Sequence, residues 1–328
     1  MNKPLLICLT PVRNEAWVLN AFLKATSLWA DHIIIADQGS TDGSREIALN
    51  YSKVIIVDNL STEMQQTEAR QLLFNETKKI KGKKILFALD ADEFISGNFI
   101  QTESWQKILN SKPGEVFCFK WITLCPSINE FTQDNLWMHW ASNIGENNLQ
   151  GDFPYNYIHE WRLPYPKSLI SQTCIDDISF IHFANINEAR QKMKQRFYQV
   201  FTKCKEPNKS LISLYRMYHN EIKRKKLQIN NSIYSFYNKN GLNLFDEIKL
   251  SDLGDYYKDE IFKCFDEKGI AYFQGLDIWE ESFINNYGIK DPRSLKTKLL
   301  HLYLKLTQRS SNLIVIRGVD KVLKKIGL

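Results

Sequence analysis

Short apolar runs alternate with longer amphipathic stretches over about the first 95 residues of the chain. Apolar runs typical of β-strands occupy Leu5–Thr10, His32–Asp37, Lys53–Asp58 and Lys84–Asp90. Helical spacing predicts helices between them at Glu15–Trp29, Ser44–Tyr51 and Glu63–Lys81. Strands rich in Ile, Leu and Val that each precede a helix are typical of parallel sheets covered on both faces. With right-handed crossovers, this order predicts a doubly wound, mainly parallel α/β sheet.

From residue 115 to residue 182 the pattern becomes strand-like and rich in aromatic side chains. Strands are predicted at Val116–Leu124, Leu136–Trp140, Trp161–Leu163 and Ile178–His182. Helical spacing returns at Asn187–Cys204 and Ser210–Gln228, and the remainder is predicted to be mainly helical. We therefore predict an α/β domain over residues 1–185, a helical extension over 186–289 and a basic amphipathic tail over 290–328.

The composition is that of a folded protein, because 44% of the 328 residues are hydrophobic and 24% are charged. The six cysteines include no C-x-x-C pair, so we expect buried free thiols in a reducing compartment rather than a zinc ribbon or a dithiol redox site. The chain shows no signal peptide, and no apolar run approaches the roughly 18–20 residues needed to cross a bilayer. These features predict a cytoplasmic protein.

The net charge of +6 is concentrated at the C-terminal end. Residues 290–328 hold ten Lys or Arg and two Asp, a net charge of +8, which leaves the first 289 residues near −2. Leu and Val recur near helical spacing from Leu295 to Ile326, with basic residues between them. Such a helix either lies on an anionic membrane surface or packs its apolar face on the α/β domain, and the sequence leaves both open. We expect no nucleic-acid partner.

Polar residues gather where the predicted strands end. The first strand leads into Thr10–Glu15, the second into Asp37–Gly43, and the fourth into Asp90-Ala91-Asp92. Residues two apart on an extended segment point to the same side, so both carboxylates can face one ligand. Divalent cations such as Mg²⁺ prefer carboxylate and phosphate oxygens, and ligands of open α/β sheets bind at the carboxyl ends of the strands. The pattern indicates a nucleotide and metal site; alternatively, these are solvated strand ends and a turn in which Ser40 or Thr41 caps a helix.

The order and spacing of three segments resemble the family 2 glycosyltransferases of the GT-A fold: Thr10–Glu15, Ile33–Ser44 and Ile85–Glu93. The resemblance covers residues 4–95 and extends more loosely to about residue 185. It is to the bacterial type with a D-x-D motif and a His-Glu element, and it implies a GT-A catalytic domain over residues 1–185.

The resemblance implies an inverting transfer of a sugar from a nucleotide-sugar donor, by family default a UDP-sugar. The acceptor would be a hydroxyl of a glycan or a lipid-linked molecule, and the reaction would depend on Mg²⁺ or Mn²⁺. Such an enzyme would serve the synthesis of cell-envelope polysaccharides, in the cytoplasm or peripherally on the inner face of the cell membrane.

The resemblance also implies roles for individual residues. It assigns donor binding to Thr10, Pro11, Val12, Arg13, Asp37, Arg70, Asp90 and Ala91. Asp92 becomes the main metal ligand and His182 a further one, although a lone histidine among apolar residues is otherwise a core residue. The family commonly has a second acid where Gln38 stands, which leaves the preferred nucleobase open.

The acceptor hydroxyl needs a base, and we expect Glu160 to supply it, because His159-Glu160 looks like the family's His-Glu element. Alternatively, Glu160 pairs with Arg162 on a surface strand, and Asp152 or the pair Asp176-Asp177 is the base. Three tryptophans would stack on sugar rings or fill the core: Trp137, Trp140 and Trp161.

Two other classes of function remain open. A sugar-phosphate nucleotidyltransferase shares a similar sheet and an acidic metal site, but it would ordinarily carry a glycine-rich loop after the first strand, and Thr10–Glu15 has no glycine. A non-catalytic peripheral membrane protein would use only the basic tail.

Overall fold

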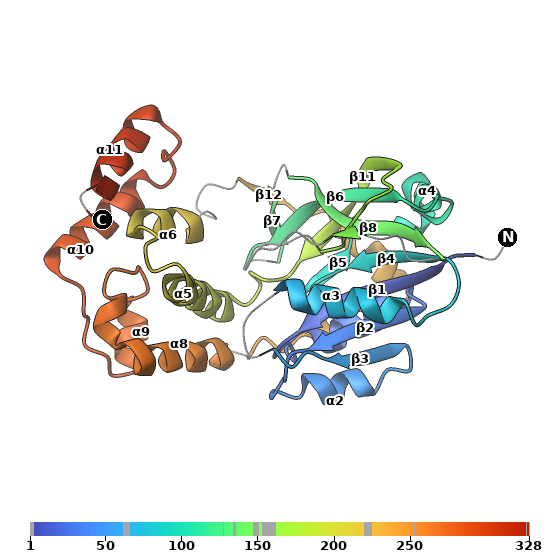
Figure 1. Cartoon of the computed structure of the whole chain (residues 1–328), viewed down its shortest axis with the longest axis horizontal. Helices are drawn as coiled ribbons and strands as arrows, with labels where there is room; N and C mark the ends of the chain where they lie inside the picture. The colour runs from blue at the N-terminus through green and yellow to red at the C-terminus, as the bar shows by residue number, and fades with distance from the viewer. Residues whose placement is uncertain are drawn as a thin grey trace. The chain divides into compact units, whose positions relative to one another are not determined.

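The computed structural model describes residues 3–61, 66–126, 128–133, 136–146, 151–152, 162–219, 225–251, 254–325 and 327. The chain forms two compact units (Figure 1). The first comprises Met1–Ile186 and Lys226–Ser251, and the second comprises Asn187–Lys225 and Asp252–Leu328. Residues 226–251, which we expected in the helical extension, belong to the first unit.

Four parallel strands form one half of the sheet of the first unit. They lie in the spatial order β4 (Lys84–Ala88), β1 (Leu5–Val12), β2 (His32–Asp37) and β3 (Val54–Asp58). All four predicted strands are present, with ends within two residues of the expected positions. Each is an apolar run bounded by polar residues; β1, β2 and β4 are mostly buried, whereas the edge strand β3 is half-buried.

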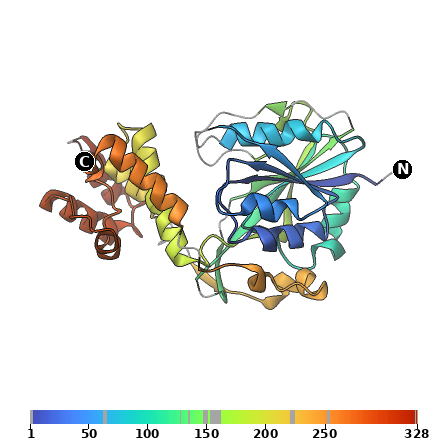
Figure 2. The same ribbon diagram turned by 90° about the horizontal axis from the view of Figure 1, so that it is seen from below.

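Helices cover both faces of these strands, as Figure 2 shows. Leu6 and Cys8 of β1 pack in one core with α1 (Leu19–Ser27), α2 (Ser44–Leu49) and α4 (Glu103–Leu109). Ile7 and Leu9, the alternate residues of the same strand, pack in a second core with α3 (Gln66–Thr77). Successive side chains of the strand therefore point into two different cores. The predicted α/β class, with helices on both faces, is confirmed.

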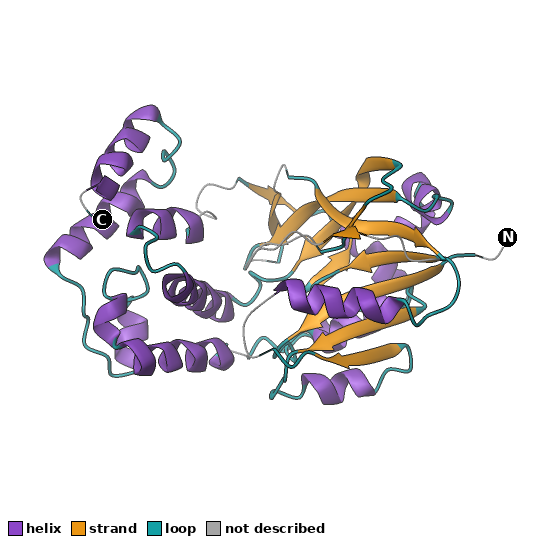
Figure 3. Cartoon of the chain, in the orientation of Figure 1, coloured by secondary structure: helices purple, strands orange, loops and turns teal. Residues whose placement is uncertain are grey.

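The other half of the sheet adds antiparallel pairs (Figure 3). Beyond β4 follow β8 (Met138–Gly145), β6 (Glu115–Leu124), β7 (Glu130–Gln133) and β12 (Lys226–Gln228). β11 (Ser171–His182) runs parallel to β6 and antiparallel to β5 (Glu93–Ile95). A separate short pair joins β9 (Gly151–Asp152) to β10 (Tyr165–Pro166).

Two sequence predictions in this region were wrong. The helix expected at Ser210–Gln228 ends early: α6 spans Leu211–Tyr218, and the three residues of β12 pair with β7 instead. The strand expected at Trp161–Leu163 is not formed by its described residues, because Arg162 and Leu163 lie in a bend. In the first case tertiary pairing overrides a weak local pattern.

The segment 226–251 returns to the sheet after β12. It contains η3 (Asn231–Tyr234), α7 (Ser235–Lys239) and η4 (Leu244–Glu247). The Tyr237 hydroxyl donates a hydrogen bond of 2.9 Å to the carbonyl of Ile95, at the end of β5. The amide of Gly97 donates one of 2.6 Å to the carbonyl of Ile233. The segment thus packs against the strand that follows Asp90-Ala91-Asp92.

The described part of the second unit is helical, which confirms the predicted C-terminal helical region. Besides α6 it holds the helices α5 (Glu188–Lys205), α8 (Asp255–Lys268), α9 (Glu281–Asn286), α10 (Leu295–Thr307) and α11 (Ile314–Lys325), and the short 3₁₀-helix η5 (Ile270–Phe273). Aromatic side chains fill its interior, where the rings of Phe265 and Trp279 stack with centroids 5.4 Å apart.

The expectation that all six cysteines are buried is wrong. All six are free thiols, but only Cys8, Cys118 and Cys125 are buried, while Cys174 is exposed. None of the helices in the described residues is both long and apolar enough to cross a membrane.

Candidate functional site

The carboxyl ends of the parallel strands meet at one edge of the sheet. Val12 of β1 lies opposite Asp37 of β2, and Asp37 lies opposite Asp58 of β3. On the other side of β1, Leu9 lies opposite Ala88 of β4, two residues before Asp90. This is the edge at which open α/β sheets bind ligands. The segments predicted to bind the donor are therefore brought together by strand register.

Side chains fasten the loop after β1 to the loop after β2. Asn14 has a φ of +55°, a left-handed conformation that asparagine tolerates better than most residues. Its Oδ1 accepts a hydrogen bond of 2.7 Å from the amide of Thr41, and its own amide donates to Ser40 Oγ at 3.0 Å. The amide of Ala16 donates to Asp42 at 2.8 Å. The helix-cap alternative is wrong, because α2 begins at Ser44, whose amide donates to Asp42 at 3.0 Å.

Asp37 organises the turn at the end of β2. Its side chain is 4% exposed, Oδ1 accepts from the amide of Ser40 at 3.2 Å, and Oδ2 accepts from Arg45 Nη1 at 3.1 Å. Thr10 and Val12 are buried in β1, whereas Pro11 and Arg13 are half-buried. These residues, predicted to bind the donor, therefore lie at the same edge of the sheet. Asp37 shapes this edge by accepting a hydrogen bond from the turn that follows β2.

Asp90 lies between two arginines that come from distant parts of the chain. Arg70, on α3, donates from Nη2 to Asp90 Oδ1 at 2.6 Å. Arg162 donates from its own Nη2 to Asp90 Oδ2 at 2.8 Å. Arg162 also pairs through both terminal nitrogens with Glu93, whose side chain is fully buried. Each oxygen of Asp90 thus accepts a hydrogen bond from a guanidinium group.

Burial and the arginines act in opposite directions on these carboxyl groups. Loss of water alone would raise the pKa of Asp90, but Arg162 and Arg70 lower that pKa below its usual value. Burial raises the pKa of Glu93, and the attraction of Arg162 offsets part of that effect. Burial lowers the pKa of Arg70, although the charge of Asp90 opposes the shift. Asp90 is therefore an ionised acceptor held in a fixed orientation.

Asp92 faces His182 across the junction of β5 and β11. Their contact joins Oδ2 to Nε2 at 3.2 Å, and both side chains are at most 16% exposed. Pairing of His182 with Glu93 in the β5–β11 ladder brings the histidine to the motif. The imidazole stacks on Trp121 of β6, with ring centroids 4.4 Å apart. The structure thus brings together the two residues predicted as metal ligands.

Asp92 and His182 fit a divalent cation whose remaining ligands would come from the donor. Within the described residues there is no group of three or more His, Cys, Asp or Glu able to hold a metal. Mg²⁺, however, is usually held by one or two carboxylates together with substrate phosphates and water. Neighbouring ligands of an octahedral Mg²⁺ lie roughly 3 Å apart, close to the separation of Asp92 and His182. In addition, Arg70 Nη1 is buried without a hydrogen-bond partner among the described residues, which leaves a donor for an anionic ligand.

The sequence interpretation missed Arg162, Glu93 and Trp121 as parts of this site. Besides its two carboxylate partners, the Arg162 guanidinium lies over the rings of Trp121 and Trp140, 5.4 and 5.2 Å from their centroids. The only sequence signal was adjacency: Glu93 follows Asp92, and Arg162 lies two residues after Glu160. Neither position belongs to a periodic pattern.

The predicted base cannot be placed, because Glu160 lies outside the described residues, as does Trp161. Of its rivals, Asp176 is exposed and pairs with Lys120 at 3.0 Å. It lies six residues before His182 on β11, within the register shift between Ile175 and Ser179. The backbone of Asp152 lies in β9.

Residues 8–110 match the family model of glycosyl transferase family 2. This segment runs from β1 through α4 and includes Asp37, Arg70, Asp90 and Asp92. It is a glycosyltransferase domain. The predicted enzyme class is thereby confirmed for the part of the first unit that carries the carboxyl ends of the parallel strands. His182 and Arg162 lie beyond the matched residues.

Solved structures of low similarity accompany this match. Glucosyl-3-phosphoglycerate synthase from Mycobacterium tuberculosis, in complex with Mn²⁺, UDP and glucosyl-3-phosphoglycerate, is 19% identical with a TM-score of 0.27; the likeness covers 37% of this chain and 44% of that one. GalNAc-T7 with UDP, GalNAc and Mn²⁺ is 12% identical with a TM-score of 0.36, over 83% of this chain and 57% of that one.

A third structure, 4-diphosphocytidyl-2C-methyl-D-erythritol synthase, is 10% identical with a TM-score of 0.29, over 44% of this chain and 76% of that one. Similarity at this level does not identify the reaction of the glycosyltransferase domain. The chain spans less than half the length of the synthase from Mycobacterium tuberculosis. No significant match was found among curated proteins.

Proposed function

We propose that this protein transfers a sugar from a nucleotide-sugar, in first place a UDP-sugar, to a hydroxyl of a glycan or lipid-linked acceptor, with inversion at the sugar. The observation that carries the proposal is the pairing of Asp92 with His182 beside Asp90, at the carboxyl edge of a glycosyltransferase domain. The bacterial type of family 2 and the role in cell-envelope polysaccharide synthesis remain predictions from the sequence.

Asp92 and His182 would hold Mg²⁺ or Mn²⁺ against the donor diphosphate. When bound, a divalent cation supplies a Lewis acid that stabilises the charge of the departing nucleoside diphosphate. Arg70 supports the same step, because its buried Nη1 has no hydrogen-bond partner in the described part of the chain. Asp90, held ionised by Arg70 and Arg162, would accept hydrogen bonds from the ribose of the donor rather than bind the cation.

Glu160 is proposed as the base that takes the proton of the acceptor hydroxyl. Glu160 lies two residues before Arg162 in the chain. Arg162 is fixed to Asp90 and Glu93 by charge-assisted hydrogen bonds. The proposal rests on this two-residue separation in the sequence and on the resemblance of His159-Glu160 to the family's His-Glu element. A single base suffices for one inverting displacement.

Replacing Glu160 by glutamine should leave donor binding unchanged and reduce transfer by roughly 10²- to 10⁴-fold, the usual contribution of a general base. Transfer would be measured as nucleoside diphosphate release in the presence of acceptor, and donor binding by calorimetry. The matched control is Asp177→Asn, which alters a rival carboxylate on β11. A normal rate for Glu160→Gln with a loss in Asp177→Asn would move the base to the rival.

Thermal unfolding with a panel of UDP-, GDP- and dTDP-sugars tests the donor class. A donor present at a hundred times its Kd stabilises the folded state by about 2.7 kcal/mol, which raises the unfolding temperature by several degrees. We expect the unfolding temperature to rise only with donors of one nucleobase. The rise should occur in Mn²⁺ and be absent in EDTA. Equal, negligible shifts for all donors would contradict the proposed function.

We also propose a cytoplasmic location beside the inner face of the cell membrane, where a lipid-linked acceptor would be presented. Enzyme fractionation between cytosol and washed membranes tests this location. Recovery of the whole activity in the cytosol at low salt would contradict it.

A further inference from the structure

Helix α10 has two apolar faces, and only one of them is covered. Leu300 and Leu304 pack against Ile212 and Tyr215 of α6 in a small buried core. A second row occupies the opposite side of the helix at i, i+4, i+7 and i+11: Leu295, Leu299, Leu302 and Leu306. The side chains of this second row are 53% to 74% exposed. Packing within the unit therefore leaves half of the predicted apolar pattern in contact with water.

Helix α11 repeats this arrangement. Asp320 is buried and Leu323 packs beside the core of α6 and α10. Val315, Val319 and Val322 follow one another at helical spacing and are 39% to 74% exposed. Leu313 and Ile314 extend the exposed apolar surface at the start of the helix. We call the two helices, residues 295–325, the C-terminal helix pair.

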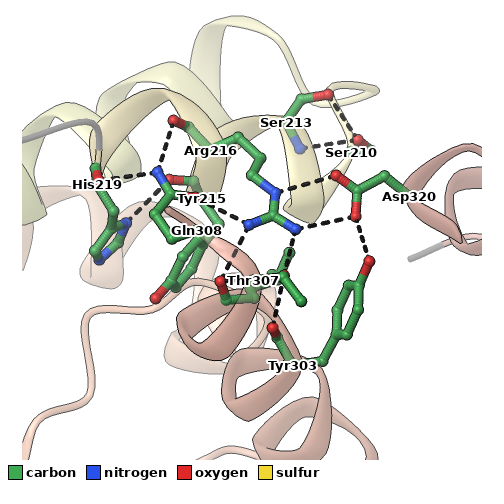
Figure 4. A network of polar contacts seen from close by, with 10 residues as sticks. Ser210, Ser213, Tyr215, Arg216, His219, Tyr303, Thr307, Gln308 and Asp320 are labelled. Atoms are coloured by element: carbon green, nitrogen blue, oxygen red, sulfur yellow. Dashed lines mark hydrogen bonds and ion pairs between the residues drawn. The ribbon is translucent and has the colours of Figure 1, made fainter. Parts of the chain in front are cut away.

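Arg216, whose side chain is 13% exposed, holds the C-terminal helix pair to α6 (Figure 4). Arg216 donates to both oxygens of Asp320 at 3.0 and 3.1 Å, and Tyr303 donates to the same carboxylate at 2.9 Å. The other terminal nitrogen of Arg216 donates to Gln308 at 3.0 Å and to the carbonyl of Leu304 at 3.1 Å. These contacts use the inward faces of both helices, so the exposed rows stay outward.

The charges around the exposed rows are of one sign. Eight basic residues of this region are exposed: Lys296, Lys298, Lys305, Arg309, Arg317, Lys321, Lys324 and Lys325. Both acids of residues 290–328 are paired, Asp320 with Arg216 at 3.0 Å, and Asp291 with Arg293 at 2.9 Å and with Lys298 at 3.0 Å. Exposed apolar rows flanked by an excess of positive charge match the chemistry of a bilayer with anionic headgroups.

We propose that the C-terminal helix pair binds an anionic lipid surface through these two rows and their basic flanks. The inference rests on the membrane location proposed above and not on the catalytic chemistry. In this proposal the helix pair packs one face on its own unit and offers the other face to lipid.

The test is flotation of the full chain with two kinds of vesicle, pure phosphatidylcholine and equal parts of phosphatidylcholine and phosphatidylglycerol. We expect binding to the anionic vesicles to exceed binding to the neutral ones by more than about tenfold, since each basic residue near the lipid contributes to attraction. The excess should shrink as salt is added. Equal binding to both vesicles, or no binding to either, would overturn the proposal.

The double variant Leu302→Glu, Leu306→Glu should lower binding to the anionic vesicles by about tenfold or more, because two apolar side chains are lost from the surface. Both side chains are exposed, so circular dichroism should be unchanged. The matched control is Leu49→Glu, an equally exposed leucine of the first unit, 68% exposed, which should bind like the wild type.

Two further outcomes keep the inference separate from the catalytic proposal. Donor turnover without vesicles should be the same in the double variant and the wild type; its loss would overturn the assignment of these leucines to lipid alone. If light scattering showed a wild-type dimer that the double variant abolishes, with no vesicle binding, the exposed rows would instead be the contact between two copies of the chain.

Discussion

Replacing Asp92 by asparagine is expected to reduce metal-dependent donor turnover by roughly 100- to 1,000-fold. A bound divalent cation contributes several kcal/mol to the stability of a charged transition state, and each 1.36 kcal/mol is a factor of ten in rate. Asparagine keeps the size of the side chain but removes the charge that would hold the ion next to His182. The measurement is nucleoside diphosphate release at saturating Mn²⁺, with the same reaction in EDTA.

The matched control is Asp266→Asn, which removes an exposed carboxylate of α8 in the second unit. It should retain the wild-type rate and the wild-type response to Mn²⁺. Full activity of the Asp92→Asn enzyme, or wild-type turnover that is unaffected by EDTA, would contradict the proposed metal site. Unchanged circular dichroism of the Asp92 variant would exclude unfolding as the cause of a loss.

Replacing Arg162 by methionine is expected to lower the free energy of unfolding by about 3–5 kcal/mol, the usual cost of removing one partner of a buried ion pair. The loss leaves the fully buried Glu93 without its guanidinium and removes one of the two arginines on Asp90. Urea denaturation followed by tryptophan fluorescence measures the change. The double variant Glu93→Gln, Arg162→Met should recover part of the loss, because it leaves no uncompensated buried charge.

The second unit offers a matched control for this prediction. Arg196 is as buried as Arg162, at 8% exposed, but its partner Glu280 is 57% exposed. Arg196→Met leaves a carboxylate that water can solvate, so it should cost less than Arg162→Met. Equal losses for the two variants would show that burial of the arginine stem, rather than the charge left on Glu93, determines the effect.

Local patterns were sufficient to predict the parallel half of the fold and the edge where its site lies. The apolar runs of β1, β2, β3 and β4 are each bounded by polar residues, and helical spacing marks α1, α2 and α3. Because all carboxyl ends of parallel strands point to one edge, Asp37 and Asp90 could be placed on the same edge from their positions in the sequence. The approach of His182 to Asp92 was expected from a family resemblance and not from any local pattern.

The region after residue 115 was harder to predict because its strands are antiparallel or irregular. Residues 226–228 follow a run with helical spacing, yet they complete the sheet beside β7. β11 follows β6 with a shift in register between Ile175 and Ser179. Pairing of this kind depends on which strand edge is open in the folded chain. The local sequence pattern does not predict which edge that is.

The sequence by itself determined the α/β class, the succession of the four parallel strands along the chain and the acidic motif after the fourth, since these follow from short-range periodicity and one topological rule. Only the tertiary structure decided how the charges of that motif are used. Arg70 and Arg162 reach Asp90 from 20 and 72 residues away, which leaves Asp92 as the carboxylate that faces His182. It also decided which rows of the C-terminal helices are covered, because a buried face and an exposed one have the same helical spacing.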